Sequence, residues 1–324
     1  MLKATPTSRP SSEIQSGIEA QKGFSGQANN LGLLYRLYSK LYHYICEKPA
    51  SLNILEAAFL RLYRITNRQF KPLLINGRRM KIQLHDVGIS TELALFKVHE
   101  PISTQLLPNY LKKGYSCLEI GANMGYYTLL ISDIIGREGR IYTVEPHPEN
   151  FRTLFTNISI NNLRNVVCFN VACSNYEGYG SMKVMPQSNW HRLLENHDTS
   201  GLPVEVKTVD SLTKNFKRLD LMRMDVEGHE DKVIEGSHKT IEMFKPTLFL
   251  EFHPSLVGKT STLKLLTKLK DYGYKISHFI PRFLDCPVVG KLSHAKKISI
   301  DEYMDRIENA DPIDGREANV FLSM

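Results

Sequence analysis

The 324-residue sequence has few cysteines and no long apolar run. Its five cysteines are scattered and never spaced as C-x-x-C, which argues against a disulfide framework or a thiolate zinc site and fits a reducing cytoplasm. No stretch approaches the roughly 18 consecutive apolar residues that a membrane span needs, and the chain start holds no apolar segment of signal-peptide length. With 20 glycines and 15 prolines, the chain is neither collagenous nor of low complexity. These absences predict a soluble, cytoplasmic, globular protein.

The net charge of +7 is unevenly distributed along the chain. Residues 1–80 hold 12 Lys and Arg against 4 Asp and Glu, which is +8, and residues 81–324 hold 29 against 30, which is −1. A near-neutral main part argues against a nucleic-acid groove across it, so we expect no nucleic-acid partner there. The basic N-terminal quarter remains suited to an acidic surface.

The first 71 residues divide into a tail and a basic helical segment. Residues 1–30 are rich in Ser, Gly, Gln, Asn and Pro without periodicity, which predicts a flexible tail. In residues 31–71 apolar side chains recur at helical spacing over 31–45 and 55–62, with Arg and Lys on the other faces. Such helices either pack on the main domain or a second subunit, or lie peripherally on an anionic membrane. Both interpretations stay open.

Residues 72–324 alternate short β-rich runs with helical stretches. The expected strands are a hairpin of Leu73 to Ile75 and Met80 to Leu84, then Cys117 to Ile120, Arg140 to Val144, Val166 to Phe169, Leu221 to Val226, Thr247 to Phe252, Lys275 to Phe279 and Asn319 to Leu322. The expected helices are Thr104 to Leu111, Tyr126 to Ile135, Pro148 to Ile160, Glu230 to Glu242 and Thr262 to Tyr272. This alternation predicts an α/β, Rossmann-like fold, a mostly parallel sheet with helices on both faces and ligands beyond the carboxyl ends of its strands.

The first strand of the main domain runs into a glycine turn that opens a helix. The second strand ends at Glu145, twenty residues after Gly125, where a carboxylate can accept both hydroxyls of an adenosine ribose. A dinucleotide fingerprint counted from Gly121 requires glycine at Asn123 and at Tyr126, so two of its three glycines are missing. S-adenosylmethionine has an adenosine but no pyrophosphate, and its methionine part suits a polar side chain such as that of Asn123. The pattern therefore favours S-adenosylmethionine over a nicotinamide dinucleotide.

Each of these features also has a purely structural explanation. Gly121 and Gly125 would serve any tight strand-to-helix turn, and Glu145-Pro146 would serve as an ordinary strand end followed by a proline. Their joint occurrence at this spacing is what favours a cofactor site.

Several segments together resemble a known family. They are Glu119 to Thr128, Tyr142 to Pro146, Leu219 to Glu230 with its Asp-Val-Glu-Gly-x-Glu motif, Pro246 to Pro254, His99 to Pro101, Val206 to Leu212 and Ala318 to Leu322. The chain resembles the FkbM family of S-adenosylmethionine-dependent methyltransferases over roughly residues 72–324. The resemblance implies the seven-stranded class I methyltransferase fold and methyl transfer to a hydroxyl on a sugar, a lipid-linked glycan or a secondary metabolite. Arg223 stands where members often carry Lys.

The motifs and the resemblance together predict the cofactor contacts. Residues Asn170 to Cys173 follow the third strand, where the adenine edge is usually met in this family. The expected cofactor-binding residues are Glu100, Glu119, Gly121, Ala122, Asn123, Gly125, Tyr126, Tyr127, Thr128, Glu145, Pro146, Val171, Ala172 and Asp225.

Methyl transfer to a hydroxyl also needs a group that takes the proton. The candidates follow two neighbouring strands: Asp225, Glu227, His229, Glu230, Glu251 and His253. His253 is the favoured base because an imidazole with an ordinary pKa of about 6.5 is largely unprotonated at neutral pH. Glu227 is the close alternative, Asp225 is expected to orient cofactor or acceptor, and a buried structural role for His253 stays open. His229 and Glu230 are expected to begin the next helix, where Glu230 suits the positive end.

Two further interpretations of single segments remain. Asp225, Glu227, Glu251 and His253 could gather one divalent cation, but carboxylate spacing is poor support for a metal and we do not favour one. The segment 188–191 is either a substrate-facing loop or surface packing.

Two other functions compete with a methyltransferase. One is a non-catalytic adaptor of the same fold that meets a membrane or a partner protein through residues 31–70, and the other is a nicotinamide-dependent oxidoreductase, which Asn123 disfavours. The sequence names neither the acceptor nor the oligomeric state.

Overall fold

The computed structural model describes residues 72–83, 86, 88–185, 188, 190–194, 200–287, 290–309 and 317–324. All of them belong to one compact unit of the chain, Asn53–Met324. The predicted tail and basic helices of residues 1–71 lie outside the described residues. None of the helices in the described part has the length and apolar character of a bilayer-spanning segment.

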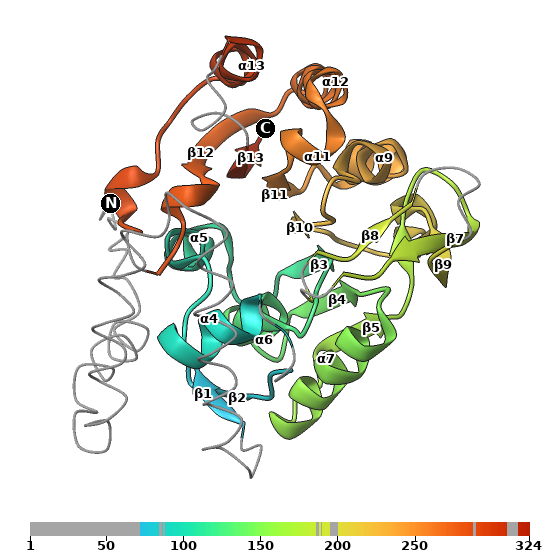
Figure 1. Ribbon diagram of the computed structural model, residues 1–324, viewed down its shortest axis with the longest axis vertical. Helices are drawn as coiled ribbons and strands as arrows, with labels where there is room; N and C mark the ends of the chain where they lie inside the picture. The colour runs from blue at the N-terminus through green and yellow to red at the C-terminus, as the bar shows by residue number, and fades with distance from the viewer. Residues whose placement is uncertain are drawn as a thin grey trace, which may run out of the picture. The chain divides into compact units, whose positions relative to one another are not determined.

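A seven-stranded sheet forms the centre of the described unit (Figure 1). Its strands, in spatial order, are β12 (Lys275–Pro281), β13 (Ala318–Ser323), β11 (Thr247–Phe252), β10 (Leu221–Met224), β3 (Ser116–Ile120), β4 (Arg140–Val144) and β5 (Val166–Phe169). The ladders from β11 to β5 are all parallel, and β13 pairs antiparallel with both of its neighbours. This is the mostly parallel sheet that the sequence predicts.

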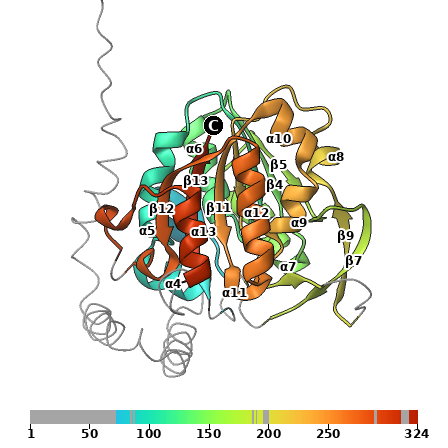
Figure 2. The same cartoon turned by 90° about the horizontal axis from the view of Figure 1, so that it is seen from above.

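Helices cover both faces of this sheet, as Figure 2 shows. On one face α9 (Glu230–Glu235), α10 (His238–Phe244), α12 (Lys259–Asp271) and α13 (Ile300–Asn309) build an apolar core with the sheet. On the other face the core is built with α4 (Ile89–Phe96), α5 (Pro101–Leu106) and α6 (Tyr126–Ile135). Neighbouring strand residues alternate between the two cores, since Leu221 belongs to the second and Met222 to the first.

The remaining described helices and helical turns are short, apart from one helix. They are α7 (Pro148–Ile160), α8 (Val209–Thr213), α11 (Pro254–Val257) and the 3₁₀ turns η1 (Leu107–Tyr110), η2 (Arg282–Leu284) and η3 (Leu292–His294). The predictions of β4, β5, β11, α6 and α7 are confirmed at both ends, whereas the predicted helix from Glu230 to Glu242 is two helices. The break follows Gly236, where a Cβ would lie 2.1 Å from the carbonyl oxygen of Ser174.

A hairpin precedes the main sheet, and its second strand begins earlier than predicted. The strands are β1 (Leu73–Ile75) and β2 (Arg78–Met80), which pair antiparallel. The turn residues Asn76 and Gly77 both have positive φ, +48° and +76°, as a two-residue hairpin turn requires. Such a tight turn leaves no room for the longer connection that the sequence suggested.

A second, four-stranded sheet lies between β5 and β10 in the chain, and the sequence did not predict it. Its strands are β6 (Ala172–Cys173), β7 (Gly178–Lys183), β8 (Arg192–Leu193) and β9 (Leu202–Lys207), in the order β6-β9-β7-β8. Only a small apolar cluster holds it together, with Met182, Val204 and Val206 buried. Strands this short, with glycines and exposed faces, give little periodic signal.

Candidate active site

Two adjoining cavities are lined by residues at the carboxyl ends of β3, β4, β10 and β11. The first, which we call the Glu145 cavity after the residue that follows β4, has an empty volume of about 610 Å³ with open solvent included. The second, which we call the Glu251 cavity after an acid near the end of β11, measures about 380 Å³ on the same basis. Four residues line both cavities: Gly121, Asn123, Asp225 and Glu227.

The glycine turn after β3 owes its sequence to a close backbone approach. Gly121 has φ +83°, and a Cβ there would lie 1.8 Å from the carbonyl oxygen of Asp225. Only glycine lets the ends of β3 and β10 approach so closely. Asn123 also has positive φ, +49°, and its backbone N–H points to the carboxylate of Glu145. The turn therefore ties the ends of three strands together.

Glu145 is held in place by main-chain donors. Its Oε2 accepts a hydrogen bond from the backbone N–H of Asn123 at 2.8 Å, and its Oε1 accepts one from the backbone N–H of His147 at 2.9 Å. Burial raises the pKa of Glu145 to about 7, although these hydrogen bonds lower it. A carboxylate fixed in this way at a cavity wall can accept further hydrogen bonds from a ligand diol.

Arg223 lies between two acids of the Glu251 cavity. Its Nη2 is 3.1 Å from Oδ2 of Asp225, its Nη1 is 3.7 Å from Oε1 of Glu119, and its guanidinium lies 4.2 Å from the ring centre of Tyr127. The hydroxyl of Thr128 donates to Oε2 of Glu119 at 2.5 Å. Burial nevertheless raises the pKa of both acids to about 7. The positive charge of Arg223 therefore does not fully offset the effect of burial on the pKa values of the two acids.

Three buried oxygens around these cavities accept no hydrogen bond from any described residue. They are Glu119 Oε1, Asn123 Oδ1 and Asp225 Oδ1. Buried acceptors are almost always paired in folded proteins, so such a group indicates a ligand that supplies donors. Two of the three belong to acids, which favours a positively charged donor.

His253 lies among three carboxylates. Its Nδ1 is 2.9 Å from Oε1 of Glu230, and its Nε2 is 3.5 Å from Oε1 of Glu251 and 3.6 Å from Oε2 of Glu227. Although burial lowers it, hydrogen bonds to Glu230 and Glu251 raise the pKa of His253 well above its ordinary value. The imidazole is therefore protonated at neutral pH and lines neither cavity. The surrounding acids, which the sequence did not show, therefore disfavour the unprotonated histidine base that the sequence predicted.

Glu227 lies in a turn that follows β10. It has φ +52°, so the chain already turns at this residue, before Gly228. Its side chain still lines both cavities together with Asp225. Burial raises the pKa of Glu227 well above its ordinary value, while His253 lowers it. Glu227 thus combines access to the cavities with a raised basicity.

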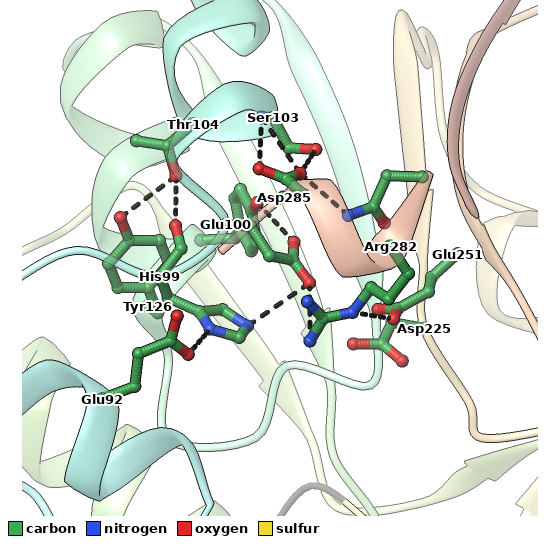
Figure 3. Close-up of polar contacts among 12 residues, drawn as sticks. Glu92, His99, Glu100, Ser103, Thr104, Tyr126, Asp225, Glu251, Arg282 and Asp285 are labelled. Atoms are coloured by element: carbon green, nitrogen blue, oxygen red, sulfur yellow. Dashed lines mark hydrogen bonds and ion pairs between the residues drawn. The ribbon is translucent and has the colours of Figure 1, made fainter. Parts of the chain in front are cut away.

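Glu251 is the first link of a buried network of charges, which Figure 3 shows. Arg282 donates from Nε to Oε1 of Glu251 at 2.6 Å, and its Nη2 lies 3.6 Å from Oε1 of Glu100. His99 follows, 3.4 Å from Glu100 and 2.5 Å from Glu92. Although burial lowers it, the two acids raise the pKa of His99 to about 10. Positive and negative groups therefore alternate in this network, of which Glu251, Arg282 and His99 line the Glu251 cavity.

The carboxylate of Asp285 fixes the segment that carries Arg282. It accepts hydrogen bonds from the backbone N–H of Ile102 at 2.7 Å and of Ser103 at 3.2 Å, and from the side chain of Asn319 at 3.1 Å (Figure 3). The start of α5, β13 and the turn η2 are thereby joined, and Arg282 is held beside the cavity.

The acids of this site are paired with arginines. Asp225, Glu251 and His253 bring ligand atoms within 4.8 Å of one another. However, Arg223 and Arg282 already bind the two carboxylates. The donor set is therefore that of an ion-pair network.

The structure brings most of the predicted residues to the cavities. Those that line one or both are Glu119, Gly121, Ala122, Asn123, Tyr126, Tyr127, Glu145, Pro146, Ala172, Asp225 and Glu227. Those that line neither are Glu100, Gly125, Thr128, Val171 and His253. Glu100 is fully buried, and it accepts a hydrogen bond from the hydroxyl of Tyr127 at 2.6 Å in addition to its contacts with Arg282 and His99.

Sequence reasoning missed several lining residues. Ile89, Asn150, Met182, Leu193, His229 and Arg282 line a cavity but were not predicted to, and Ser188 and His191 lie in the segment whose role was left open. Apart from His229, which lies in the Asp-Val-Glu-Gly-x-Glu segment, no motif marks these positions. Ile89 and Asn150 lie on α4 and α7, Met182 and Leu193 on the second sheet, and Arg282 in η2. His229 and Glu230 begin α9 as predicted.

Comparisons with known proteins find one family model and a set of solved structures. Residues 119–276 match the family model described as Methyltransferase FkbM domain. No curated protein matches the chain significantly. A methyltransferase FkbM from Methylobacillus flagellatus KT is 14% identical over 74% of this chain and 53% of that chain, with a TM-score of 0.44.

Two other solved structures are similarly distant. Fibrillarin from Aeropyrum pernix, in complex with natively bound S-adenosyl-L-methionine, is 16% identical over 68% of this chain and 74% of that chain, with a TM-score of 0.38. An rRNA methylase from Streptococcus thermophilus is 9% identical over 68% of this chain and 93% of that chain, with a TM-score of 0.40. These likenesses carry no argument about the acceptor.

Proposed function

Residues 119–276 of this chain form a methyltransferase FkbM domain, and from this premise we propose that the protein transfers the methyl group of S-adenosylmethionine to a hydroxyl of a sugar, a lipid-linked glycan or a secondary metabolite. The family indicates a methyltransferase that uses S-adenosylmethionine. The choice of a hydroxyl acceptor rests on the side chains of the Glu251 cavity.

The observation that carries the proposal is the set of three buried oxygens that lack donors, on Glu119, Asn123 and Asp225. An ammonium group has three N–H donors and a positive charge, so the ammonium of S-adenosylmethionine complements them. Its sulfonium adds a second positive charge beside acids whose pKa burial has raised. The residues present therefore fit this cofactor.

The Glu145 cavity suits the adenosine part. Both oxygens of Glu145 are oriented by backbone donors and retain lone pairs for the two ribose hydroxyls. Ala172 and Cys173 also line this cavity, at the position where the resemblance places the adenine edge. The adenosine and methionine parts then meet at the residues that line both cavities.

The Glu251 cavity suits a polar acceptor. Glu251 provides carboxylate oxygens, Arg282 provides N–H donors, and His99 adds a cationic ring to the same wall. Such walls favour hydroxyl groups over an apolar surface, because buried polar groups are stable only when they are hydrogen-bonded. This supports an acceptor that carries several oxygens.

Glu227 is the proposed base. When bound, S-adenosylmethionine supplies a methyl group activated by its positively charged sulfur. The chain must hold the acceptor oxygen in line, about 3 to 3.5 Å from the reacting carbon, and accept its proton. Glu227 lines both cavities, so it lies where acceptor and cofactor meet. The proton of the hydroxyl passes to Glu227, and protonated His253, 3.6 Å away, orients that carboxylate beforehand.

Titration of the full chain with S-adenosylhomocysteine in a calorimeter tests the cofactor assignment without an acceptor. We expect saturable micromolar binding to the wild type. Glu145→Ala removes charge-assisted hydrogen bonds of about 1.5 to 3 kcal/mol and should weaken binding by roughly 10- to 150-fold. Glu205→Ala is the control, because Glu205 is exposed on β9 and pairs with Lys207.

Two results would contradict the proposal at different levels. Unchanged affinity in Glu145→Ala would refute the placement of the adenosine. No binding to a folded wild type would refute the cofactor itself and favour the non-catalytic adaptor.

A further inference from the structure

His191 lies on the wall of the Glu145 cavity, and the proposed function leaves it without a role. It directly precedes β8, so the second sheet carries it to a cavity otherwise formed largely at the ends of the main strands. The residue is half-buried, and its position on the cavity wall is not one of surface packing. The side chain is thus placed to meet a ligand.

The hydrogen bond to its ring fixes where the proton of His191 lies. The backbone N–H of Met185 donates to Nδ1 of His191 at 3.0 Å. A backbone N–H can only donate, so Nδ1 must be an unprotonated acceptor. Burial and the nearby ring of His147 lower the pKa of His191 to about 4, against the opposite effect of Asp86. The ring is therefore neutral at pH 7 and carries its one N–H on Nε2.

His147 links this ring to the carboxylate expected at the ribose. The rings of His147 and His191 are 4.1 Å apart between centroids, with their planes tilted by 42°. The backbone N–H of the same His147 donates to Oε1 of Glu145 at 2.9 Å. One residue therefore fixes both an acceptor, Glu145, and the ring of a donor, His191.

An adenosine needs both kinds of group. Its ribose hydroxyls donate to a carboxylate, and its remaining lone pairs, on ribose oxygens and ring nitrogens, require donors when they are buried. Among the described residues, no hydrogen-bond acceptor contacts Nε2 of His191. We propose that His191 is a cofactor-binding residue that donates a hydrogen bond from Nε2 to the adenosine part of S-adenosylmethionine. This inference rests on the proposed function.

Two substitutions test whether His191 donates a hydrogen bond to the cofactor or only accepts the one from Met185. In His191→Asn the short side chain can still accept from Met185 but lacks the distal donor, whereas His191→Gln keeps a distal N–H and gives up the contact with Met185. The probes are S-adenosylhomocysteine and 5′-methylthioadenosine, which shares its adenosine but has no amino acid. His238→Asn is the control, because His238 is exposed on α10 and bonds to Tyr272.

We expect His191→Asn to bind both probes about 5- to 10-fold more weakly, as the loss of one neutral hydrogen bond predicts, and His191→Gln to stay within about threefold of the wild type. Three results would overturn the proposal. They are wild-type affinity in His191→Asn, an equal loss of affinity in both variants, and a loss of affinity for S-adenosylhomocysteine but not for 5′-methylthioadenosine. No binding of either probe to the wild type would overturn the proposed function as well, so the two failures are distinguishable.

Imidazole ¹⁵N resonances of the unmodified protein provide a test that does not depend on a variant's fold. The His191 signals, assigned by their absence in His191→Asn, should show a neutral ring protonated at Nε2, and the Nε2 resonance should move when S-adenosylhomocysteine binds. A protonated ring, or an Nε2 resonance that does not respond, would overturn the proposal.

Discussion

The described residues that line the Glu145 cavity all come from within 119–276, whereas the Glu251 cavity also takes Ile89, His99 and Arg282 from outside that range. Glu145 is oriented by two backbone N–H groups of neighbouring turns. Glu251 is oriented by the side chain of Arg282, 31 residues further along the chain, and by that of His253, which follows the same strand. The first cavity is thus fixed by local backbone geometry, and the second by mutually dependent charges.

This difference predicts how the two cavities respond to change. A backbone donor persists when a nearby side chain is replaced, so the cofactor cavity should tolerate substitutions around it. A buried ion pair that loses one partner leaves an uncompensated charge, so the Glu251 cavity should fail as a unit. Variants that affect turnover without affecting cofactor binding should therefore concentrate in the Glu251 cavity.

The largest effect is expected for Glu227→Gln, which removes the proposed base at the boundary of the cavities. Loss of a positioned base typically costs about 10²- to 10⁴-fold in turnover. Affinity for S-adenosylhomocysteine should stay within a few-fold, because Glu227 is not among the oxygens that lack donors. Turnover is measured as the transfer of a labelled methyl group to an acceptor, which is found by screening hydroxylated compounds. Affinity for S-adenosylhomocysteine is measured by calorimetry.

Glu235→Gln is the matched control for that variant. Glu235 is an exposed acid on α9 whose carboxylate accepts from Asn175. Near wild-type turnover in Glu227→Gln would show that Glu227 is not the base and would make Asp225 the next candidate.

An intermediate effect is expected for Arg282→Gln, which tests whether the wall of the second cavity formed by Glu251 and Arg282 serves the acceptor. Loss of charge-assisted hydrogen bonds of about 1.5 to 3 kcal/mol should lower kcat/KM for the acceptor by roughly 10- to 150-fold, mainly through KM. Affinity for S-adenosylhomocysteine should be unchanged. The control is Arg218→Gln, since Arg218 is exposed and pairs with Asp220. A loss of cofactor affinity in Arg282→Gln would contradict the proposal that Arg282 serves the acceptor and not the cofactor.

The same division explains what the sequence could predict. The main strands and the glycine turn depend on short-range patterns, so β4, β11, α6 and the position of Glu145 follow from neighbouring residues. The predicted residues on such segments, among them Gly121 and Glu145, reach the wall of the cofactor cavity. Asn150, Met182 and Leu193 also line it but lie on elements without a motif, and the predicted Val171 does not line it.

The second cavity depends on contacts between segments far apart in the chain. Arg282 meets Glu251 across 31 residues, and Asp285 meets Ser103 across 182. No local pattern contains such a pairing. The protonated state of His253 is the clearest example, because it follows from three carboxylates whose convergence only the fold creates.

The smallest effect expected is a dependence of cofactor binding on pH. Burial raises the pKa of Glu119, Glu145 and Asp225 to about 7, whereas Arg282 holds the pKa of Glu251 well below its ordinary value. Acids around the cofactor should therefore titrate near neutrality, while Glu251 stays ionised. A bound ammonium favours the ionised acids, so affinity for S-adenosylhomocysteine should fall below pH 7, by about tenfold per unit for each proton released.

Calorimetry at pH 6, 7 and 8 in buffers of different ionisation enthalpy measures that proton release. Glu119→Gln should reduce the number of protons released, and Arg282→Gln should not. Binding that releases no proton would show that the acids are already ionised in the free protein.

Thermal stability should change with pH in the opposite direction. The folded protein holds these protons up to about pH 7, whereas the unfolded chain releases them near the ordinary pKa of about 4, so their contribution to stability is present below pH 4 and lost as pH rises through 7. A bound cation replaces the lost protons as the neutralising charge. The increase in Tm caused by saturating S-adenosylmethionine should therefore be larger at pH 8 than at pH 6, and equal increases would mean that the cation does not lie beside these acids.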